Sequence, residues 1–304
     1  MSLLLAVLMQ VGPFSSPDAR PASPLPPELQ DRSRRHRTTA ALPPLLRRAE
    51  PVECTEAIKA DPVSAAAGAQ AALAKASGLE KISAGQCLGM ALTQSGRWDD
   101  AAAAFKDARA LIPADAEAEN ARWSARLGGM QGVATLEAGH NDDAAAVLAS
   151  AVADARRASS PTLAGDLQVD QARALLRLGR VDEAGATLDA ARAASPTNAE
   201  AWLGSATLSR KAHKLDQAQA QIARAGELDP RDPAIGIEAG VIAILAGRED
   251  AARKSWQSVI LTAPDSPEAA QARAYLDQLG GQSATPAAAG SPATAPTSVV
   301  IGGK

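Results

Sequence analysis

The most constraining feature of this chain is a fixed step of 34 residues in its second half. Prolines occur at this step, at Pro196, Pro230 and Pro264. Alanines repeat it, at Ala184, Ala218 and Ala252. A period of this size is typical of a protein built from stacked supersecondary units, because one unit cannot bury its apolar face alone. The spacing therefore predicts a repeat architecture.

The repeats are expected to be helical. Between residues 51 and 280, no stretch alternates apolar and polar residues strictly enough to predict a strand. Of the 304 residues, 46% are apolar and only 2% aromatic, so the core must consist mainly of small and aliphatic side chains. Such side chains let helices pack closely. The net charge of −3 offers no electrostatic case for nucleic-acid binding.

The helices are predicted to come in pairs. In the last full unit, residues 235–246 form one expected helix and residues 248–262 the next, with Gly247 at the corner. Glycine accepts the positive φ that such a corner requires, and Pro264 ends the second helix. An aspartate near the start of each second helix complements the positive helix end. These aspartates are Asp182, Asp216 and Asp250.

This pattern resembles the tetratricopeptide repeat. That repeat is a helix pair with Gly or Ala at position 8, Gly at 15, a bulky residue at 17, Ala at 20, a large residue at 24, Ala at 27 and Pro at 32. The unit from Ile82 has Gly89, Gly96, Trp98, Ala101, Phe105, Ala108 and Pro113. The unit from Gly165 has Ala172, Gly179, Val181, Ala184, Leu188, Ala191 and Pro196.

Two further units keep the same phase and one is looser. The unit from Ala199 has Trp202, Ala206, Leu215, Ala218, Ile222, Ala225 and Pro230, with His213 in place of the corner glycine. The unit from Pro233 has Gly240, Gly247, Glu249, Ala252, Trp256, Val259 and Pro264. The looser unit has Gly132, Gly139, Ala144, Leu148 and Ala151. Extra residues are expected around Trp123 and around residues 159–161, a degenerate pair at 53–77, and a capping helix at 267–279.

The resemblance implies an all-α fold, a right-handed superhelix of antiparallel helix hairpins over residues 51–280. A related helical-hairpin solenoid and a compact bundle are the competing architectures. Residues 20–50 are expected to be a linker rich in Pro and Arg, because dense prolines block helix formation. Residues 281–304 are of low complexity, which predicts a disordered tail rich in Ala, Pro and Thr.

Residues 3–11 form an apolar run that is too short to cross a bilayer but fits the core of a signal peptide. No basic residue precedes the run. We expect residues 1–19 to be a signal peptide and the protein to be periplasmic or secreted. The alternative is an unprocessed N-terminus on a cytoplasmic protein. The composition, rich in Ala, Arg and Gly, is typical of bacterial proteins.

The two cysteines, Cys54 and Cys87, are 33 residues apart, which is close to one repeat. If both lie on first helices of neighbouring repeats, they can face each other and form a disulfide. That bond would require an oxidising compartment. The alternative is two buried thiols that act as small apolar residues.

The sequence offers no chemistry typical of an enzyme. The three histidines, His36, His140 and His213, have no partner at helical spacing, and two cysteines without a CxxC pattern do not supply a metal site. Asp99, Asp100 and similar pairs are explained by helix capping. We therefore expect a protein that is not an enzyme and has no cofactor or bound metal.

In the family that this chain resembles, the first helices line a concave groove that accepts a segment of a partner protein. The groove positions of three units predict a basic zone beside an apolar patch. The basic zone is Arg173, Arg177, Arg210 and Lys211. The apolar residues are Leu203, Ile237, Val241 and Ile244. We expect this groove to bind a protein or peptide segment with acidic and apolar residues.

The resulting hypothesis is a binding scaffold or adaptor that holds a protein segment during bacterial envelope assembly or secretion. Two alternatives remain at this level. The chain can be a structural subunit that self-associates or stays in a stable complex, or it can be a cytosolic regulatory module.

Overall fold

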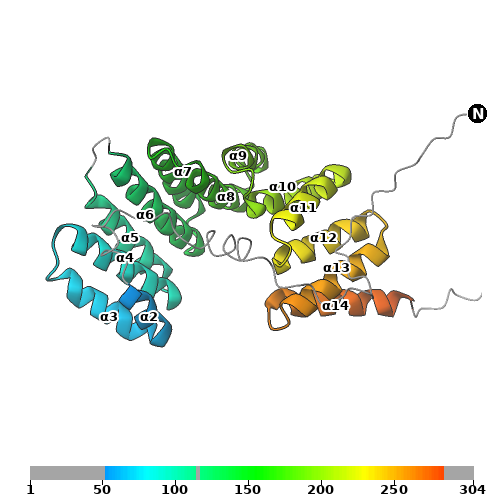
Figure 1. Ribbon diagram of the computed structural model, residues 1–304, viewed down its shortest axis with the longest axis horizontal. Helices are drawn as coiled ribbons and strands as arrows, with labels where there is room; N and C mark the ends of the chain where they lie inside the picture. The colour runs from blue at the N-terminus through cyan, green and yellow to red at the C-terminus, as the bar shows by residue number, and fades with distance from the viewer. Residues whose placement is uncertain (1–51, 114–116, 284–304) are drawn as a thin grey trace, which may run out of the picture. The chain divides into compact units, whose positions relative to one another are not determined.

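The computed structural model describes residues 52–113 and 117–283 (Figure 1). The expected signal peptide, 1–19, and linker, 20–50, lie outside this part, as do residues 284–304 of the expected tail. The described residues form thirteen helices and no strand. By contacts between Cα atoms the chain divides after Asp229 into two compact units. The described part of unit 1 contains α2–α11, and that of unit 2 contains α12–α14.

In unit 1, consecutive helices pack side by side as hairpins (Figure 1). They are α2 (Val52–Ala60), α3 (Pro62–Leu73), α4 (Gly78–Gln94), α5 (Trp98–Ala110), α6 (Ala118–Glu137), α7 (Asn141–Arg157), α8 (Pro161–Arg177), α9 (Val181–Ala194), α10 (Ala199–Lys211) and α11 (Leu215–Leu228). The expected degenerate pair at 53–77 is thus α2 and α3. The extra residues near Trp123 and 159–161 lengthen α6, α7 and α8, which have 20, 17 and 17 residues.

The hairpin corners have the backbone that the sequence predicted. Gly96, Gly139 and Gly179 in unit 1 and Gly247 in unit 2 have φ values of 69°, 90°, 73° and 70°. His213 takes the same left-handed conformation, with φ of 57°, although it has a side chain. A non-glycine residue at such a φ is uncommon and unfavourable. The corner before α11 is therefore set by the packing of its two helices rather than by local preference.

Small residues on the first helix of a pair face large residues on the second. A Cβ atom added to Gly89 of α4 would overlap the ring of Phe105 of α5, and one added to Gly132 of α6 would lie 2.5 Å from Leu148 Cγ of α7. At the same repeat position stands Ala172, and the residue 16 positions later is Leu188; both are buried in one cluster. Such matching of small and large side chains allows the close packing that is typical of protein interiors.

A polar network ties α5, α6 and α7 together inside unit 1. Arg109 of α5 donates hydrogen bonds to Ser124 of α6 at 3.0 Å, to Ser150 of α7 at 2.9 Å and to Asp154 of α7 at 2.8 Å. Asp154 also accepts hydrogen bonds from Ser124 and Arg157. Burial by itself raises the pKa of Asp154, but these three donors outweigh it and hold the pKa below its usual value.

In unit 2, α12 (Pro233–Leu245) and α13 (Glu249–Thr262) form a hairpin that α14 (Pro267–Ser283) covers. The Trp256 ring occupies the space left by Gly240, and its indole N–H donates to the Ile237 carbonyl at 3.2 Å. Tyr275 of α14 lies against the same ring, with centroids 4.9 Å apart. The expected capping helix is present, and it extends four residues beyond the predicted end at 279.

Candidate functional site

The predicted groove residues of unit 1 lie on α8 and α10. The side chains of Arg173, Arg177 and Lys211 are exposed, and those of Leu203 and Arg210 are half-buried. Val169, one turn before Arg173 on α8, is buried in the core. The first helices of this unit thus present a row of long basic side chains over a packed apolar layer.

Two of the basic side chains, Arg173 and Arg177, are paired with acidic residues. Arg173 donates to Asp170 on its own helix at 2.7 Å and to Glu200 at the start of α10. Arg177 donates to the Leu136 carbonyl and to the Glu137 carboxylate of α6, both at 2.7 Å. Each arginine therefore bridges its own repeat to a neighbouring one.

The basic zone predicted for this face leaves out two carboxylates of α8, Asp166 and Asp170. Asp166 accepts a hydrogen bond from Asn198 at 2.7 Å, yet the desolvation of its carboxyl group raises its pKa. Burial also raises the pKa of Asp170, against the opposing effect of Arg173 and with some help from Asp166. The groove is consequently a mixed surface of paired charges. The sequence did contain a sign of this mixed charge, because Glu200 also occupies a groove position of its repeat, 27 residues after Arg173.

The apolar part of the predicted groove must be corrected in unit 2. Ile237 is buried, in a cluster with Trp256 and with residues of α14. Val241 and Ile244 are partly buried against the same cluster. The capping helix covers this side of α12, since its own apolar residues Tyr275, Leu276 and Leu279 need burial. Ile237 is therefore a core residue and not available for binding a partner.

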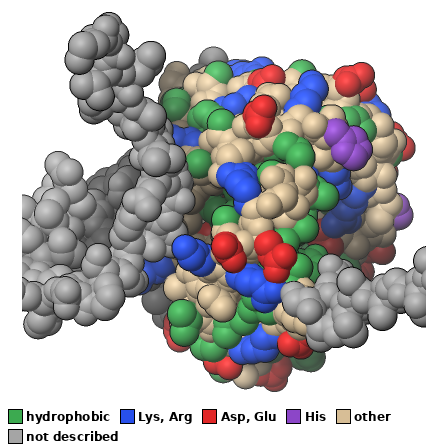
Figure 2. Space-filling view, turned by 90° about the vertical axis from the view of Figure 1, so that its right-hand side faces the viewer, with side chains coloured by type: hydrophobic (Ala, Val, Ile, Leu, Met, Phe, Trp, Pro, Cys, Tyr) green, Lys and Arg blue, Asp and Glu red, His purple; other side chains and the backbone are tan. Residues whose placement is uncertain are grey.

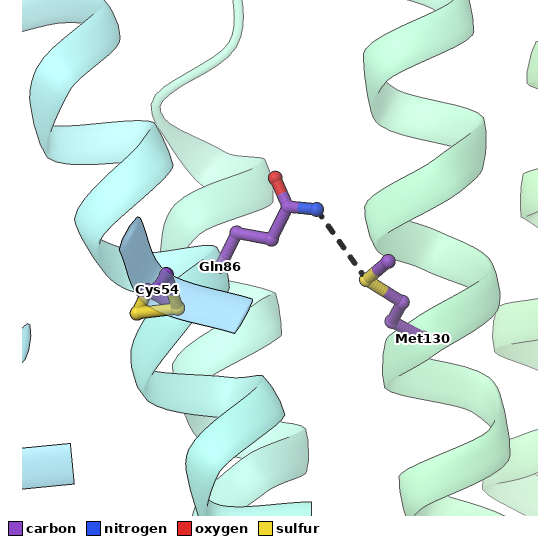
Figure 3. The surroundings of a disulfide bond; sticks show 4 residues. Cys54, Gln86 and Met130 are labelled. Carbon is purple, nitrogen blue, oxygen red and sulfur yellow. Dashed lines mark hydrogen bonds between the residues drawn. A yellow bond between two sulfur atoms is a disulfide. The ribbon is translucent and has the colours of Figure 1, made fainter. Parts of the chain in front are cut away.

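The structure joins Cys54 of α2 and Cys87 of α4 by a disulfide, with 6.0 Å between their Cα atoms (Figure 3). Both cysteines belong to a small cluster that includes Ile58 and Ala91. Gln86, next to Cys87, donates to the Met130 sulfur of α6 at 4.0 Å, as Figure 3 shows. Both cysteines lie on first helices of neighbouring pairs, because α2 begins the degenerate pair and α4 begins the next one.

The molecular surface carries both signs of charge. On the face that Figure 2 presents, basic and acidic side chains alternate, with hydrophobic groups between them. Within 52–113 and 117–283, no group of residues suits a metal ion, and no helix is long and apolar enough to span a membrane. The first-helix face of unit 1 is one such surface, with paired charges on stacked helices.

Comparison with known proteins agrees with this architecture. Two models of the tetratricopeptide repeat match residues 130–199 and 175–237. Among curated proteins there is no significant match.

Several solved structures share the fold. A tetratricopeptide repeat protein from Parabacteroides merdae ATCC 43184 is 16% identical, covers 76% of this chain and 86% of its own, and has a TM-score of 0.56. BtubC (BKLC) from P. vanneervenii is 13% identical, with coverages of 83% and 99% and a TM-score of 0.54. TTC0263, a thermophilic TPR protein of Thermus thermophilus, is 22% identical, with coverages of 64% and 98% and a TM-score of 0.48.

Stacked antiparallel hairpins with an exposed charged face on their first helices define a helical-repeat scaffold for protein interactions. The chain contains tetratricopeptide repeats, as its repeat pattern, its fold and the family models over residues 130–237 show.

Proposed function

We propose that the first-helix face of unit 1 binds an acidic and apolar segment of a partner protein. The observation that carries this proposal is the exposure of its ion pairs. The side chains of Arg173 and Glu200 are 49% and 52% exposed, and those of Arg177 and Glu137 are 44% and 40% exposed. Exposed pairs contribute only about 0–1 kcal/mol. A carboxylate of a partner can therefore replace Glu200 or Glu137 at little cost.

Reversal of the four basic charges tests this proposal. Partners are first captured by cross-linking to the full chain in its native cells and identified by mass spectrometry. Replacement of Arg173, Arg177, Arg210 and Lys211 by Glu should reduce their binding at least about tenfold, because like charges repel across an interface. A control reverses four exposed lysines outside the groove, namely Lys75, Lys81, Lys106 and Lys254. If the two variants bind the partners equally well, the proposal that this face binds them is wrong.

A charge swap separates partner binding from internal stability. The double variant Arg173→Glu, Glu200→Arg keeps an ion pair between α8 and α10 but exchanges its polarity. Both this variant and Arg173→Glu alone place a glutamate beside Asp170. The double variant should melt at a higher temperature than Arg173→Glu alone, since it retains the pair with α10, and it should still bind the partner more weakly than the wild type. If the swap restores binding as well as stability, Arg173 serves only to join the two repeats.

We propose that the scaffold acts outside the bacterial cytoplasm, in envelope assembly or secretion. Support comes from the apolar run at 3–11 and from the Cys54–Cys87 pairing, because disulfides persist in oxidising compartments. The intact mass of protein from native cells tests this compartment. Loss of about 19 residues, together with a mass two hydrogens below the reduced form, agrees with export. Full-length, reduced protein would instead favour a cytosolic regulatory module.

Sedimentation of the purified chain distinguishes an adaptor from a structural subunit. An adaptor should be monomeric alone and should gain mass only when the captured partner is added. A stable assembly without any partner would favour the structural subunit instead.

A further inference from the structure

Unit 1 has a cleft on its second helices, away from the proposed groove face. A cleft of about 290 Å³ opens between α9 and α11, with α10 as its floor. Its volume lies at the lower end of the range of about 300–1,000 Å³ that is typical of small-molecule sites. It can therefore admit one long side chain but not a helix.

The packing of α9 on α10 fixes how the cleft is arranged. A Cβ atom on Gly185 would lie 3.2 Å from Leu208, and one on Gly204 would lie 3.0 Å from Leu188, so the two helices run antiparallel. Leu188 and Leu208 form apolar walls. Because Gly185 has no side chain, the space between α9 and α11 stays open.

The decisive residue is Gln221 of α11. It lines the cleft, it is only 5% exposed, and its side-chain carbonyl oxygen has no hydrogen-bond partner. A buried acceptor without a donor is unfavourable, because it has lost its hydrogen bonds to water without replacement. The same position of other repeats holds small or short residues, namely Ala104, Val147, Thr187 and Ser255. The fold does not require an amide here, so the carbonyl oxygen is available to a donor from outside.

The charges of the cleft favour a positive ligand. Asp182 and Asp189 both line it from α9, and their spacing of seven residues places them on one helix face, about 10 Å apart. Lys214 is the cation among the lining residues. Asp189 is paired with Arg192 of its own helix, but its carboxylate is 69% exposed and can accept further hydrogen bonds.

We propose that this cleft binds an arginine side chain displayed by a partner protein. The guanidinium group has five N–H donors in a planar fork. One donor meets the carbonyl oxygen of Gln221 and others meet the carboxylate of Asp189, while the methylene groups pack against Leu188 and Leu208. The site shares no residue with the basic groove row, so either proposal can fail without the other.

Short peptides titrated into the full chain test the site. The probe is acetyl-Gly-Ala-Arg-Ala-Gly-amide, and its binding is measured from NMR chemical-shift changes of the isotope-labelled protein. Matched peptides carry citrulline, which removes the charge, or norleucine, which also removes the donors. The arginine peptide should bind most tightly, the citrulline peptide about fivefold or more weakly, and the norleucine peptide weakest.

Variants of the cleft identify the contacts. Gln221→Leu should weaken the arginine peptide about tenfold or more, as expected for a lost hydrogen bond to a charged group. Gln221→Ser, which copies Ser255, provides a second replacement if the first does not fold. Asp189→Asn should weaken binding several-fold. Asp142→Asn, at the repeat position equivalent to Asp182, should leave it unchanged.

Several outcomes would overturn the proposal. They are equal binding of the arginine peptide to the Gln221 variants and the wild type, equal binding of the norleucine peptide, and no binding at millimolar peptide. A further variant replaces Arg32, Arg34, Arg35 and Arg37 by Gln in the full chain. If the peptide binds only that variant, the arginine comes from this chain's own N-terminal segment, and the assignment to a partner is wrong.

Discussion

At the scale of single residues, this fold depends on the matching of sizes between the two helices of a pair. Gly89 faces Phe105, and Gly132 faces Leu148. In a third pair the same two positions hold Ala172 and Leu188, both buried in one cluster. The sequence showed that these positions hold small residues. It did not show that a glycine accompanies an aromatic ring, because the facing residues are 16 positions apart and meet only when the hairpin closes.

The first prediction concerns Gly89. Gly89→Ala places a methyl group into the Phe105 ring and should lower the free energy of unfolding by about 1–3 kcal/mol, as overpacking does. Phe105→Leu added to it copies the Ala172 and Leu188 combination and should restore part of the loss. Gly68→Ala is the control. No atom outside its own helix lies within 4 Å of its added Cβ atom, so it should raise stability slightly. Urea unfolding measures all three.

At the scale of elements, two buried carboxylates on neighbouring helices have opposite effects on stability. Asp154 of α7 is 8% exposed and holds Arg109 of α5. Asp170 of α8 is 23% exposed and has a raised pKa, because desolvation exceeds the benefit of Arg173. Burial alone does not explain this difference, because it raises the pKa of both carboxyl groups. The number of donors that reach each carboxylate decides the sign.

We predict that Asp154→Asn lowers the free energy of unfolding at pH 7 by about 2–4 kcal/mol, since it leaves Arg109 without its carboxylate. The pKa of Asp154 is lowered in the folded state, so its contribution is present above the unfolded pKa of about 3.9 and is lost as pH falls through the folded pKa. The difference between variant and wild type should therefore shrink below about pH 4.

Asp170→Asn should behave in the opposite way. Because the folded pKa of Asp170 is raised, the ionised carboxylate is unfavourable at neutral pH, and the neutral amide should stabilise the protein there. The gain should disappear as the wild-type carboxyl group takes up its proton in acid. Urea midpoints between pH 3 and pH 7 compare both variants, and a destabilised Asp170→Asn at neutral pH would contradict the assignment.

At the scale of the whole molecule, the described residues divide into two units, each with a core of its own. Unit 1 has clusters around Phe105 and around Leu148, and unit 2 has one around Trp256. Helix α2, the first described helix of unit 1, buries few apolar side chains. In α2, the buried apolar residues are Cys54 and Ile58, among those whose side chains are described. The disulfide to Cys87 is the strongest restraint on that helix.

Reduction of the disulfide should consequently loosen α2 first. The chain-entropy estimate for a loop of 33 residues is about 3–4 kcal/mol. Hydrogen exchange of the reduced protein should show lost protection in residues 52–60, while α6–α8 keep theirs. Cys54→Ser with Cys87→Ser should reproduce the reduced state and should be insensitive to reductant. Unchanged protection of α2 after reduction would show that packing alone holds it.

The repeat period, the helix pairs and their glycine corners could be predicted from the sequence, because these depend on local backbone preferences and on spacing along the chain. The exposure of the long basic residues of α8 could be predicted in the same way. The folded structure was needed to show which charges those residues meet, that Ile237 lies beneath α14, and that Gln221 lines a cleft between α9 and α11. Such facts depend on side chains from separate helices, and a one-dimensional pattern does not encode the distances between them.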